Sequence, residues 1–336
     1  MSETAAAEIE SVRHRLGGNL VIDDLSMEIP AGSIYGLIGP NGSGKTTTMR
    51  LLLRIYSPDE GSVKIFGESD GRSDQLRIGY LPEERGLYPR MTVEKTLLFF
   101  ARLRGVEDGP QEMQRWLERL GVTEWSGKRV EQLSKGMGQK IQFIAAAMGK
   151  PRLVILDEPF SGLDPVNLDL LRDAVLRLRD EGTTVILSTH DMGVAQGMCD
   201  RVGMIFRGRK VLDGEIQSIR REYGAPRLRV HLGANDLAAA SAGEVVAEGS
   251  AAASSSVDGD SVVALLEPVP GVSVLPSTRP DAIEIGLEDL SQRGEVLRLL
   301  AGEYDVDTFE TVRPSLHDIF VQIAGPEATQ NPSPQS

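Results

Sequence analysis

A glycine-rich segment of the chain has the composition and spacing of a loop that binds phosphate. Residues 39–46 read GPNGSGKT, a glycine followed after four residues by a Gly-Lys-Thr triplet. The apolar run SIYGLI before it predicts a strand, and residues 47–53 after it predict a helix. Glycines let backbone N–H groups point at phosphate oxygens, and a helix N-terminus adds partial positive charge. The segment therefore predicts a phosphate site rather than a plain glycine-rich turn.

The side chains of this loop have the chemistry to hold a nucleotide and a magnesium ion. Lys45 is expected to reach the β- and γ-phosphates, and Thr46 to bind Mg²⁺ through its hydroxyl. Backbone N–H groups supply the remaining donors. We therefore expect the nucleotide to be bound by Gly39, Pro40, Asn41, Gly42, Ser43, Gly44, Lys45, Thr46 and Thr47.

Two adjacent acids follow another predicted strand. Residues 153–158 read LVILDE, four apolar residues and then Asp157 and Glu158. A buried strand would deliver both acids to its carboxyl end, where open α/β sheets bind their ligands. Asp157 suits the Mg²⁺ shell, directly or through water, and Glu158 suits a general base that polarises the attacking water. A solvated loop is the alternative, which the nearby phosphate loop disfavours.

A histidine stands at the end of a third predicted strand. His190 follows residues 185–188, which read VILS. A single histidine is more often structural or exposed than catalytic, but this one is expected at the same sheet edge as the two acids. There its imidazole is expected to hydrogen-bond the γ-phosphate and orient the water. The predicted catalytic group is therefore Lys45, Glu158 and His190.

Elements that alternate between strand and helix must position these residues. Three short apolar runs, rich in β-branched residues, suit strands buried on both faces of a parallel sheet. They cover residues 33–38, 153–156 and 183–187. Residues 168–178 have apolar side chains at three- and four-residue steps, which predicts an amphipathic helix, and residues 202–213 predict a hairpin. This alternation predicts an α/β fold over residues 1–223.

A smaller domain is expected after residue 223, where the composition changes. A chain of 336 residues is long enough for two domains. Residues 224–324 predict an α+β domain, interrupted by a flexible insertion rich in Ala, Ser and Gly over residues 237–260. Polar residues 325–336 predict a disordered tail. The expected elements are strands at 271–275, 282–287 and 306–312, a helix at 290–300, and a last helix from Pro314 with Ser315 and Asp318 in capping-box spacing.

Charge and composition exclude several classes of protein. The chain has 36 Lys and Arg against 49 Asp and Glu, a formal net charge of −13. Nucleic-acid binders normally present a basic face, so no nucleic-acid partner is expected. The single cysteine, Cys199, excludes a disulfide framework and a cysteine-rich zinc site. No run approaches the ~20 apolar residues of a membrane span, and the N-terminus has no signal-peptide pattern.

One further string distinguishes among the families that share a phosphate loop and an acidic strand end. Residues 132–139 read QLSKGMGQ, shortly before the acidic strand, and they resemble the LSGGQ signature of ABC-transporter ATPases. The matching residues are Leu133, Ser134 and Gly136, whereas Lys135 and Met137 depart from it. Residues 161–164, SGLD, resemble the loop that follows the catalytic glutamate in that family. The motifs occur in family order over about two-thirds of the chain.

The resemblance implies a P-loop NTPase fold: an ABC-type ATPase domain with antiparallel β and helical subdomains, plus a small C-terminal α+β domain. It implies an ATP-binding and ATP-hydrolysing subunit that uses Mg²⁺ and powers export of an unknown substrate through a separate transmembrane permease. The implied location is the cytoplasmic face of the cell membrane, reached through that permease. The strings YLPEERGLY, LSKGM and PSLHDIFVQIAG resemble the bacterial branch associated with drug or sodium export.

The resemblance also implies roles for single residues. His190 resembles the switch histidine of the family. Glu83 stands where the family usually has a glutamine that senses the nucleotide and the permease, and its carboxylate can still bind Mg²⁺. The position that usually stacks on adenine falls at Leu16, which lacks an aromatic face, so Tyr35 or another ring is the alternative.

Two protein partners are implied. ATP is expected between the phosphate loop of one subunit and Ser134 and Gly136 of a second ATPase subunit. This second subunit is either an identical chain or a sister chain. Lys135 is expected to face solvent.

The insert between Glu83 and Ser134 is expected to be helical and to receive the coupling helix of the permease, which is the second partner. Helices are expected at 97–103 and 111–120, and another at 139–148. The candidate contacts are Leu87, Tyr88 and Met91, unless these side chains belong to the core.

Two other functions are weaker fits. Soluble ABC ATPases of translation usually carry two ATPase domains, and those of repair carry coiled coils or zinc cysteines; this sequence shows one phosphate loop and neither of those features. A small-molecule kinase with a phosphate loop would not explain the QLSKGMGQ string.

Overall fold

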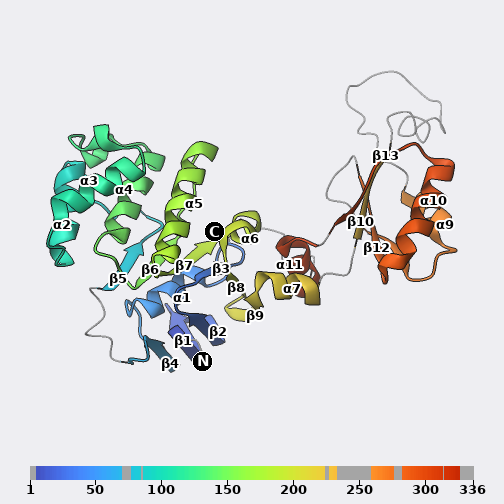
Figure 1. Ribbon diagram of the computed structural model, residues 1–336. Coiled ribbons are helices and arrows are strands. Elements are labelled where there is room, and N and C mark those ends of the chain that lie inside the picture. The colour runs from blue at the N-terminus through green and yellow to red at the C-terminus, as the bar shows by residue number, and fades with distance from the viewer. Residues whose placement is uncertain are drawn as a thin grey trace, which may run out of the picture. The chain divides into compact units, whose positions relative to one another are not determined.

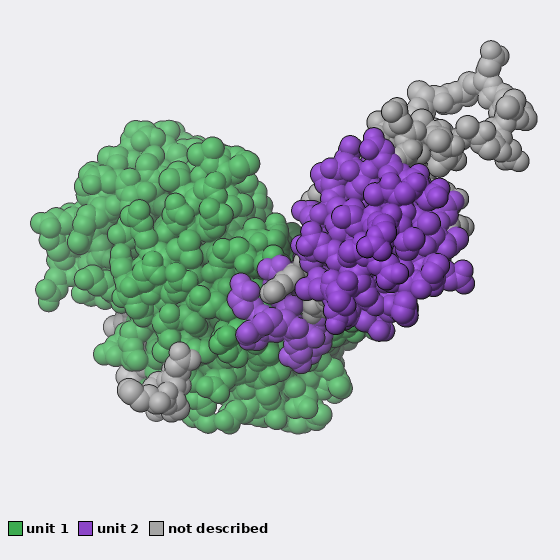
Figure 2. Space-filling view, turned by 45° about the vertical axis from the view of Figure 1, so that its right-hand side comes forward, with its two compact units in different colours: residues 1–216, 320–336 green, residues 217–319 purple. Residues whose placement is uncertain are grey.

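The computed structural model (Figure 1) describes residues 5–69, 77–84, 86–223, 227–232, 259–275, 282–312 and 314–325. These residues form two compact units: residues 217–319 make up the second, and the rest belong to the first (Figure 2). This division follows Ile216, and the boundary expected after residue 223 stays a prediction. The expected flexible insertion lies outside the described residues up to residue 258, as does the expected tail from residue 326.

A six-stranded sheet forms the centre of the first unit, in the order β5-β6-β7-β3-β8-β9. The strands are β3 (Ile34–Ile38), β5 (Ile78–Leu81), β6 (Leu153–Asp157), β7 (Thr184–Thr189), β8 (Arg201–Phe206) and β9 (Arg209–Glu215). All pairs are parallel except β8 with β9, which form the predicted hairpin. Every residue of β3, β6 and β7 is buried, which confirms the buried strands expected from their apolar runs.

Helix α1 (Lys45–Leu52) and a second sheet share one core with the central sheet. The second sheet is antiparallel, with the order β2-β1-β4. Its strands are β1 (Ala5–Leu16), β2 (Asn19–Pro30) and β4 (Glu60–Ile65). Ile9, Leu25, Met49 and Ile155 all lie in this common core, and burying each such side chain stabilises the fold by roughly 1.5–3 kcal/mol. The antiparallel subdomain implied by the resemblance is confirmed.

Two further helices connect the strands that carry the predicted site residues. Helix α5 (Pro165–Asp180) buries Leu171, Val175 and Leu178, which confirms the predicted amphipathic helix. Its first turn is capped by Asp164, whose carboxylate accepts a hydrogen bond from the N–H of Asn167 at 3.1 Å. Helix α6 (Met192–Met198) follows β7.

A helical insert lies between β5 and β6, as the resemblance implied. It contains α2 (Val93–Leu103), α3 (Gly109–Arg119), α4 (Lys135–Ala147) and the short helices η2 (Thr123–Trp125) and η3 (Val130–Gln132). Helix α4 was expected to begin at Gln139, and this was wrong. It begins four residues earlier because the hydroxyl of Ser134 accepts a hydrogen bond from the N–H of Met137 at 3.2 Å and caps the first turn.

No helix in the described part of the chain combines the length and the apolar character needed to cross a membrane.

The second unit is built on a four-stranded antiparallel sheet in the order β11-β12-β10-β13. Its strands are β10 (Arg227–Leu232), β11 (Val272–Leu275), β12 (Ile283–Leu287) and β13 (Val306–Val312), and its helices include α9 (Gly259–Leu266), η4 (Leu290–Gln292) and α10 (Arg293–Glu303). Alternate residues such as Leu228 and Ile285 pack against Val296 of α10. The three predicted strands and the predicted helix are confirmed, while β10 and α9 were not predicted.

Helices α7 (Ile216–Glu222) and α11 (Leu316–Ala324) flank this unit along the chain. The predicted capping box before α11 is confirmed: the N–H and the hydroxyl of Ser315 donate to the carboxylate of Asp318 at 2.8 and 2.7 Å.

Strand β5 packs so closely on α4 that one glycine tolerates no side chain. A Cβ atom added at Gly79 would collide with the backbone carbonyl oxygen of Ala146. Gly79→Ala should therefore lower the free energy of unfolding by about 1–3 kcal/mol, because a backbone carbonyl cannot turn away. Gly197→Ala in α6, where the space is open, is the control and should change it by no more than ~1 kcal/mol. Urea unfolding of the full chain measures both, and equal stabilities would contradict this packing.

Candidate functional site

The parallel sheet brings the predicted site residues to one edge. Strands β6, β7 and β3 are neighbours, and their register pairs Asp157 with Ser188 and Ile38 with Thr189. The phosphate loop follows β3, the two acids end β6, and His190 follows β7. The convergence expected from the separate apolar runs is therefore present in the structure.

The phosphate loop needs glycine at its turns. Gly39 and Gly44 have φ angles of 151° and 111°, and Gly42 has a φ of 75°, in the region that favours glycine. A Cβ atom at Gly39 would also collide with the carbonyl oxygen of Ile205 in the neighbouring strand. The loop is thus held against the sheet by close backbone contacts, with α1 starting directly after it.

The ammonium group of Lys45 lies inside this loop. It donates to the carbonyl oxygens of Gly39 at 2.8 Å and Pro40 at 3.1 Å, and Nζ lies 3.9 Å from Oε1 of Glu158. Burial lowers the pKa of this lysine, and nearby carboxylates partly oppose the shift by raising it. These carboxylates are those of Glu158, Asp157 and Glu83.

Asp157 is held by two hydroxyl groups. Oδ1 accepts hydrogen bonds from Ser188 at 2.6 Å and from Thr46 at 3.3 Å. Oδ2 is buried and has no hydrogen-bond partner among the described residues. Ser188 was missed by the sequence analysis, although a hydroxyl at the end of an otherwise apolar strand beside the acids was the available signal.

Glu158 has a constrained backbone and faces the histidine. Its φ of 48° is unusual for a residue with a side chain and costs roughly 1–3 kcal/mol. Its N–H donates to the hydroxyl of Ser188 at 2.9 Å, and its carbonyl accepts from the amide of Gln139 at 3.3 Å. Oε1 lies 3.0 Å from Nδ1 of His190. Gln139, at the fifth position of α4, is a second residue that sequence reasoning missed.

A pocket of about 410 Å³ opens between these groups. Nine of its lining residues were predicted from the sequence as site residues: Asn41, Gly42, Gly44, Lys45, Thr46, Thr47, Glu83, Glu158 and His190. Val21 and Ser161 also line it and were not predicted. The other predicted residues of the loop, Gly39, Pro40 and Ser43, are not among the lining residues. Leu16 is 44% exposed and is not among the lining residues.

Tyr35 cannot stack on a base, so that alternative was wrong. The side chain is fully buried, and its hydroxyl donates to the carboxylate of Asp213 at 2.9 Å. Desolvation by this burial, together with that carboxylate, raises the pKa of the phenol.

The signature residues lie outside this pocket. Ser134 is exposed at the start of α4, and Gly136 is half-buried against Leu163. Lys135 is exposed, as expected, and its ammonium also donates to the hydroxyl of Ser161 at 3.4 Å. The exposed first turn of α4 has the partial positive charge of a helix N-terminus.

Comparison with known proteins shows similarity to ABC transporter ATP-binding proteins over most of the chain. The model of the ABC transporter family matches residues 22–161. The model described as the C-terminal domain of DrrA1-3-like ATP-binding proteins matches residues 254–324. An AAA domain model, described as a putative AbiEii toxin of a type IV toxin–antitoxin system, matches residues 129–195.

Several curated proteins are similar to the chain. An uncharacterized ABC transporter ATP-binding protein, YhaQ of Bacillus subtilis, is 38% identical over 94% of this chain and 98% of its own length. The Nod factor export ATP-binding protein I of Burkholderia lata is 34% identical, covering 68% of this chain and 77% of its own. The linearmycin resistance ATP-binding protein LnrL of Bacillus subtilis is 32% identical over 62% and 68% of the two chains.

Solved structures agree. A structure of the ATP binding subunit of an ABC transporter superposes with a TM-score of 0.61 and 28% identity, covering 65% of this chain and 93% of the other. CbiO1 of Clostridium perfringens, at 23% identity, has the same fold with a TM-score of 0.59 over 66% and 92% of the two chains. The chain therefore belongs to the family of ABC transporter ATP-binding proteins, which bind and hydrolyse ATP.

Proposed function

We propose that this ATPase powers export of a substrate through a separate membrane-spanning permease. The observation that carries the proposal is the convergence of Lys45, Glu158 and His190 on one pocket beside a phosphate loop, whose Thr46 donates to Asp157. Two similar proteins are named for export of Nod factor and for linearmycin resistance, and the C-terminal domain resembles that of DrrA-like proteins. These likenesses favour export over a soluble ATPase of translation or repair.

In the proposed site the phosphate loop binds the triphosphate of ATP. The ammonium of Lys45 donates to two backbone carbonyls and lies near the Glu158 carboxylate, and from this buried position it can turn to the β- and γ-phosphates. Backbone N–H groups of the loop and the N-terminus of α1 supply further donors.

The residues present also fit a magnesium ion. Mg²⁺ prefers oxygen ligands and binds through one or two carboxylates together with substrate phosphates. The hydroxyl of Thr46 and the unpartnered Oδ2 of Asp157 are suitable donors, and Glu83 lines the same pocket. A bound Mg²⁺ would neutralise negative charge on the phosphates, and Ser188 keeps Asp157 oriented to hold the ion.

Glu158 and His190 have the geometry to activate and position water. The Glu158 carboxylate would take up the proton of the attacking water, or polarise its O–H bond, as general base. Nδ1 of His190 contacts this carboxylate, which leaves the far side of the imidazole ring to contact the γ-phosphate. Both side chains line the pocket.

A second ATPase subunit is needed to complete the proposed site. Ser134 and Gly136 lie away from the pocket of their own chain, at the exposed N-terminus of α4. In a head-to-tail dimer they would contact ATP bound by the other subunit. ATP binding would then favour the closed dimer and hydrolysis the open one, which is a ligand-driven shift between two states.

Replacing the proposed base tests the chemistry. Glu158→Gln should lower kcat at least ~100-fold, because an amide cannot accept the proton, while ATP binding measured by calorimetry stays within about threefold. Glu94→Gln on the exposed surface of α2 is the matched control and should keep full turnover. Full turnover by Glu158→Gln would contradict the proposed role of this carboxylate as general base.

A groove on the helical insert suits the permease. It has a volume of about 350 Å³ and is lined by residues of β5, the following loop, α2 and α4, among them Tyr80, Leu87, Phe100 and Leu103. Leu103 is 59% exposed, and beside the groove Tyr88 is 51% exposed. Large apolar groups at the surface typically mark interaction sites. We place the coupling helix of the permease in this groove, and the ATPase at the cytoplasmic face of the membrane. Met91, the third candidate contact, is half-buried.

A charge in this groove should uncouple the two proteins. Leu103→Arg should reduce co-purification with the permease from detergent-solubilised membranes at least ~tenfold, because an unpaired charge is costly to bury in an apolar interface. The basal ATPase activity of the isolated chain should stay within about twofold. Leu290→Arg, equally exposed on the second unit, is the control. Undiminished co-purification of Leu103→Arg would place the permease elsewhere.

A further inference from the structure

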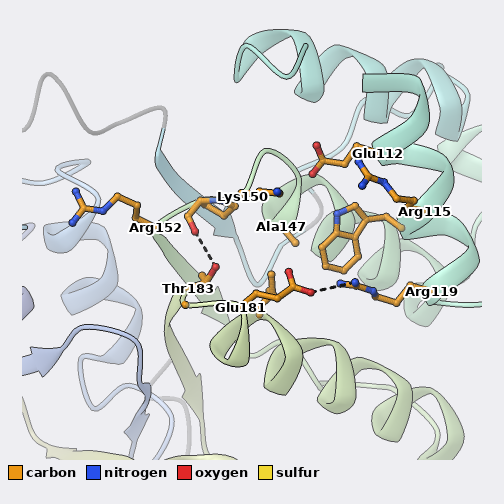
Figure 3. Close-up of a pocket in the computed structure, with 12 residues that line it drawn as sticks. Glu112, Arg115, Arg119, Ala147, Lys150, Arg152, Glu181 and Thr183 are labelled. Carbon is orange, nitrogen blue, oxygen red and sulfur yellow. Dashed lines mark hydrogen bonds and ion pairs between the residues drawn. The ribbon is translucent and has the colours of Figure 1, made fainter. Parts of the chain in front are cut away.

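A second pocket lies at the edge of the central sheet opposite the nucleotide pocket (Figure 3). Its volume is about 600 Å³. Its walls come from α3, the end of α4, the turn into β6 and the turn between α5 and β7. Since the acids and the phosphate loop lie at the carboxyl ends of the strands, this pocket at their amino ends is roughly 15 Å away, the length of β6.

Positive charge gathers in this pocket, although the chain as a whole is acidic. Arg115 and Lys150 point toward one another across it (Figure 3), and the described residues provide neither side chain with a hydrogen bond or an ion pair. Two like charges that converge repel each other, and a bound anion would relieve this. Arg152 does not contribute, because its guanidinium lies over the ring of Phe66, 3.9 Å from the centroid.

The carboxylates of the pocket are already engaged. Oε1 of Glu112 accepts a hydrogen bond from the N–H of Gly149 at 2.8 Å. Oε1 of Glu181 pairs with Arg119 at 3.3 Å, and that guanidinium also stacks over the indole of Trp116 at 4.7 Å. Glu181 is therefore paired with Arg119, whereas Glu112 keeps its negative charge and offsets only one of the two unpaired cations, so the pocket retains a net positive charge.

The pocket is also preformed. The hydroxyl of Thr183 donates to the carbonyl of Pro151 at 3.0 Å, which fixes the two turns to each other. Lys150 has a φ of 49°, in the left-handed region, and its neighbour Gly149 is tied to α3 through Glu112. A ligand would thus meet a fixed backbone framework, and only the exposed side chains of Arg115 and Lys150 would have to be ordered by it.

Two elements connect this pocket with the nucleotide site. Helix α4 donates from Gln139 to the carbonyl of Glu158 near its start, and it reaches the second pocket with Ala147 at its end. Strand β6 starts beside the pocket and ends in Asp157. Arg115 belongs to the helical insert, whereas Lys150 leads into the strand. An anion between them would fix the helical insert against the central sheet.

We propose that this pocket binds a small phosphate- or carboxylate-bearing anion between Arg115 and Lys150, and that the bound anion links the helical insert to β6. Guanidinium groups bind phosphate and carboxylate through paired hydrogen bonds, and lysine adds a point charge. The site is separate from the one for ATP and does not depend on the proposed export function.

Calorimetric titration of the full chain tests this proposal, with inorganic pyrophosphate and citrate as separate probes. The chain carries Lys45→Ala to weaken binding at the phosphate loop. Adding Arg115→Gln or Lys150→Gln should raise the Kd of the bound probe at least ~tenfold, which is the loss of affinity expected for one charge-assisted hydrogen bond. Arg115→Lys, which keeps the charge, should restore most of the affinity. Arg102→Gln, an exposed arginine on α2, is the control.

The outcomes separate clearly. If one of the two probes binds and this binding is lost in both glutamine variants, the result supports the site. The probe that binds, pyrophosphate or citrate, then identifies the class of anion. If the chain binds neither probe, or if both glutamine variants bind as tightly as Arg102→Gln, the pocket is not an anion site.

Discussion

The parallel register of β6 against β7 is the constraint on which the nucleotide pocket depends. It pairs Asp157 with Ser188 at the carboxyl ends of two fully buried strands. A slip by one residue would turn Ile155 and Ile186 away from the core they share and carry the polar residues to the wrong face. The burial that stabilises the sheet therefore also fixes the position of the acids.

The same burial makes the site electrostatically demanding. Lys45, Asp157 and Glu158 are all at least nine-tenths buried, yet an oxygen of Asp157 has no partner among the described residues. The pKa of Lys45 is lowered by desolvation, and Glu158 keeps a left-handed backbone. A nucleotide with its metal would relieve these costs, which explains why a fold tolerates them at this edge and why binding would reorganise little.

Sequence patterns predict this site well because its parts are local. The phosphate loop, the acids after LVIL and the histidine after VILS each lie within a few residues of an unmistakable apolar run. Ser188 and Gln139 escaped notice because their roles come from neighbours distant in the chain, 31 and 19 residues away. The strands β1 and β2 were not predicted individually because irregular register interrupts their alternation, and β10 follows a break in composition. The start of α4 was misjudged because two glycines obscure a helix that Ser134 caps.

The measurement that tests this account most directly is the magnesium dependence of ATP hydrolysis by Ser188→Ala. The change removes the hydroxyl that donates to Asp157 and accepts from the N–H of Glu158, while the rest of β7 keeps its buried side chains. The account predicts that the Mg²⁺ concentration for half-maximal activity rises, or kcat falls, by about 10- to 100-fold, with ATP binding in the absence of Mg²⁺ unchanged. A variant with the magnesium dependence and kcat of the unaltered chain would contradict the claim that the register of β6 and β7 positions the two carboxylates.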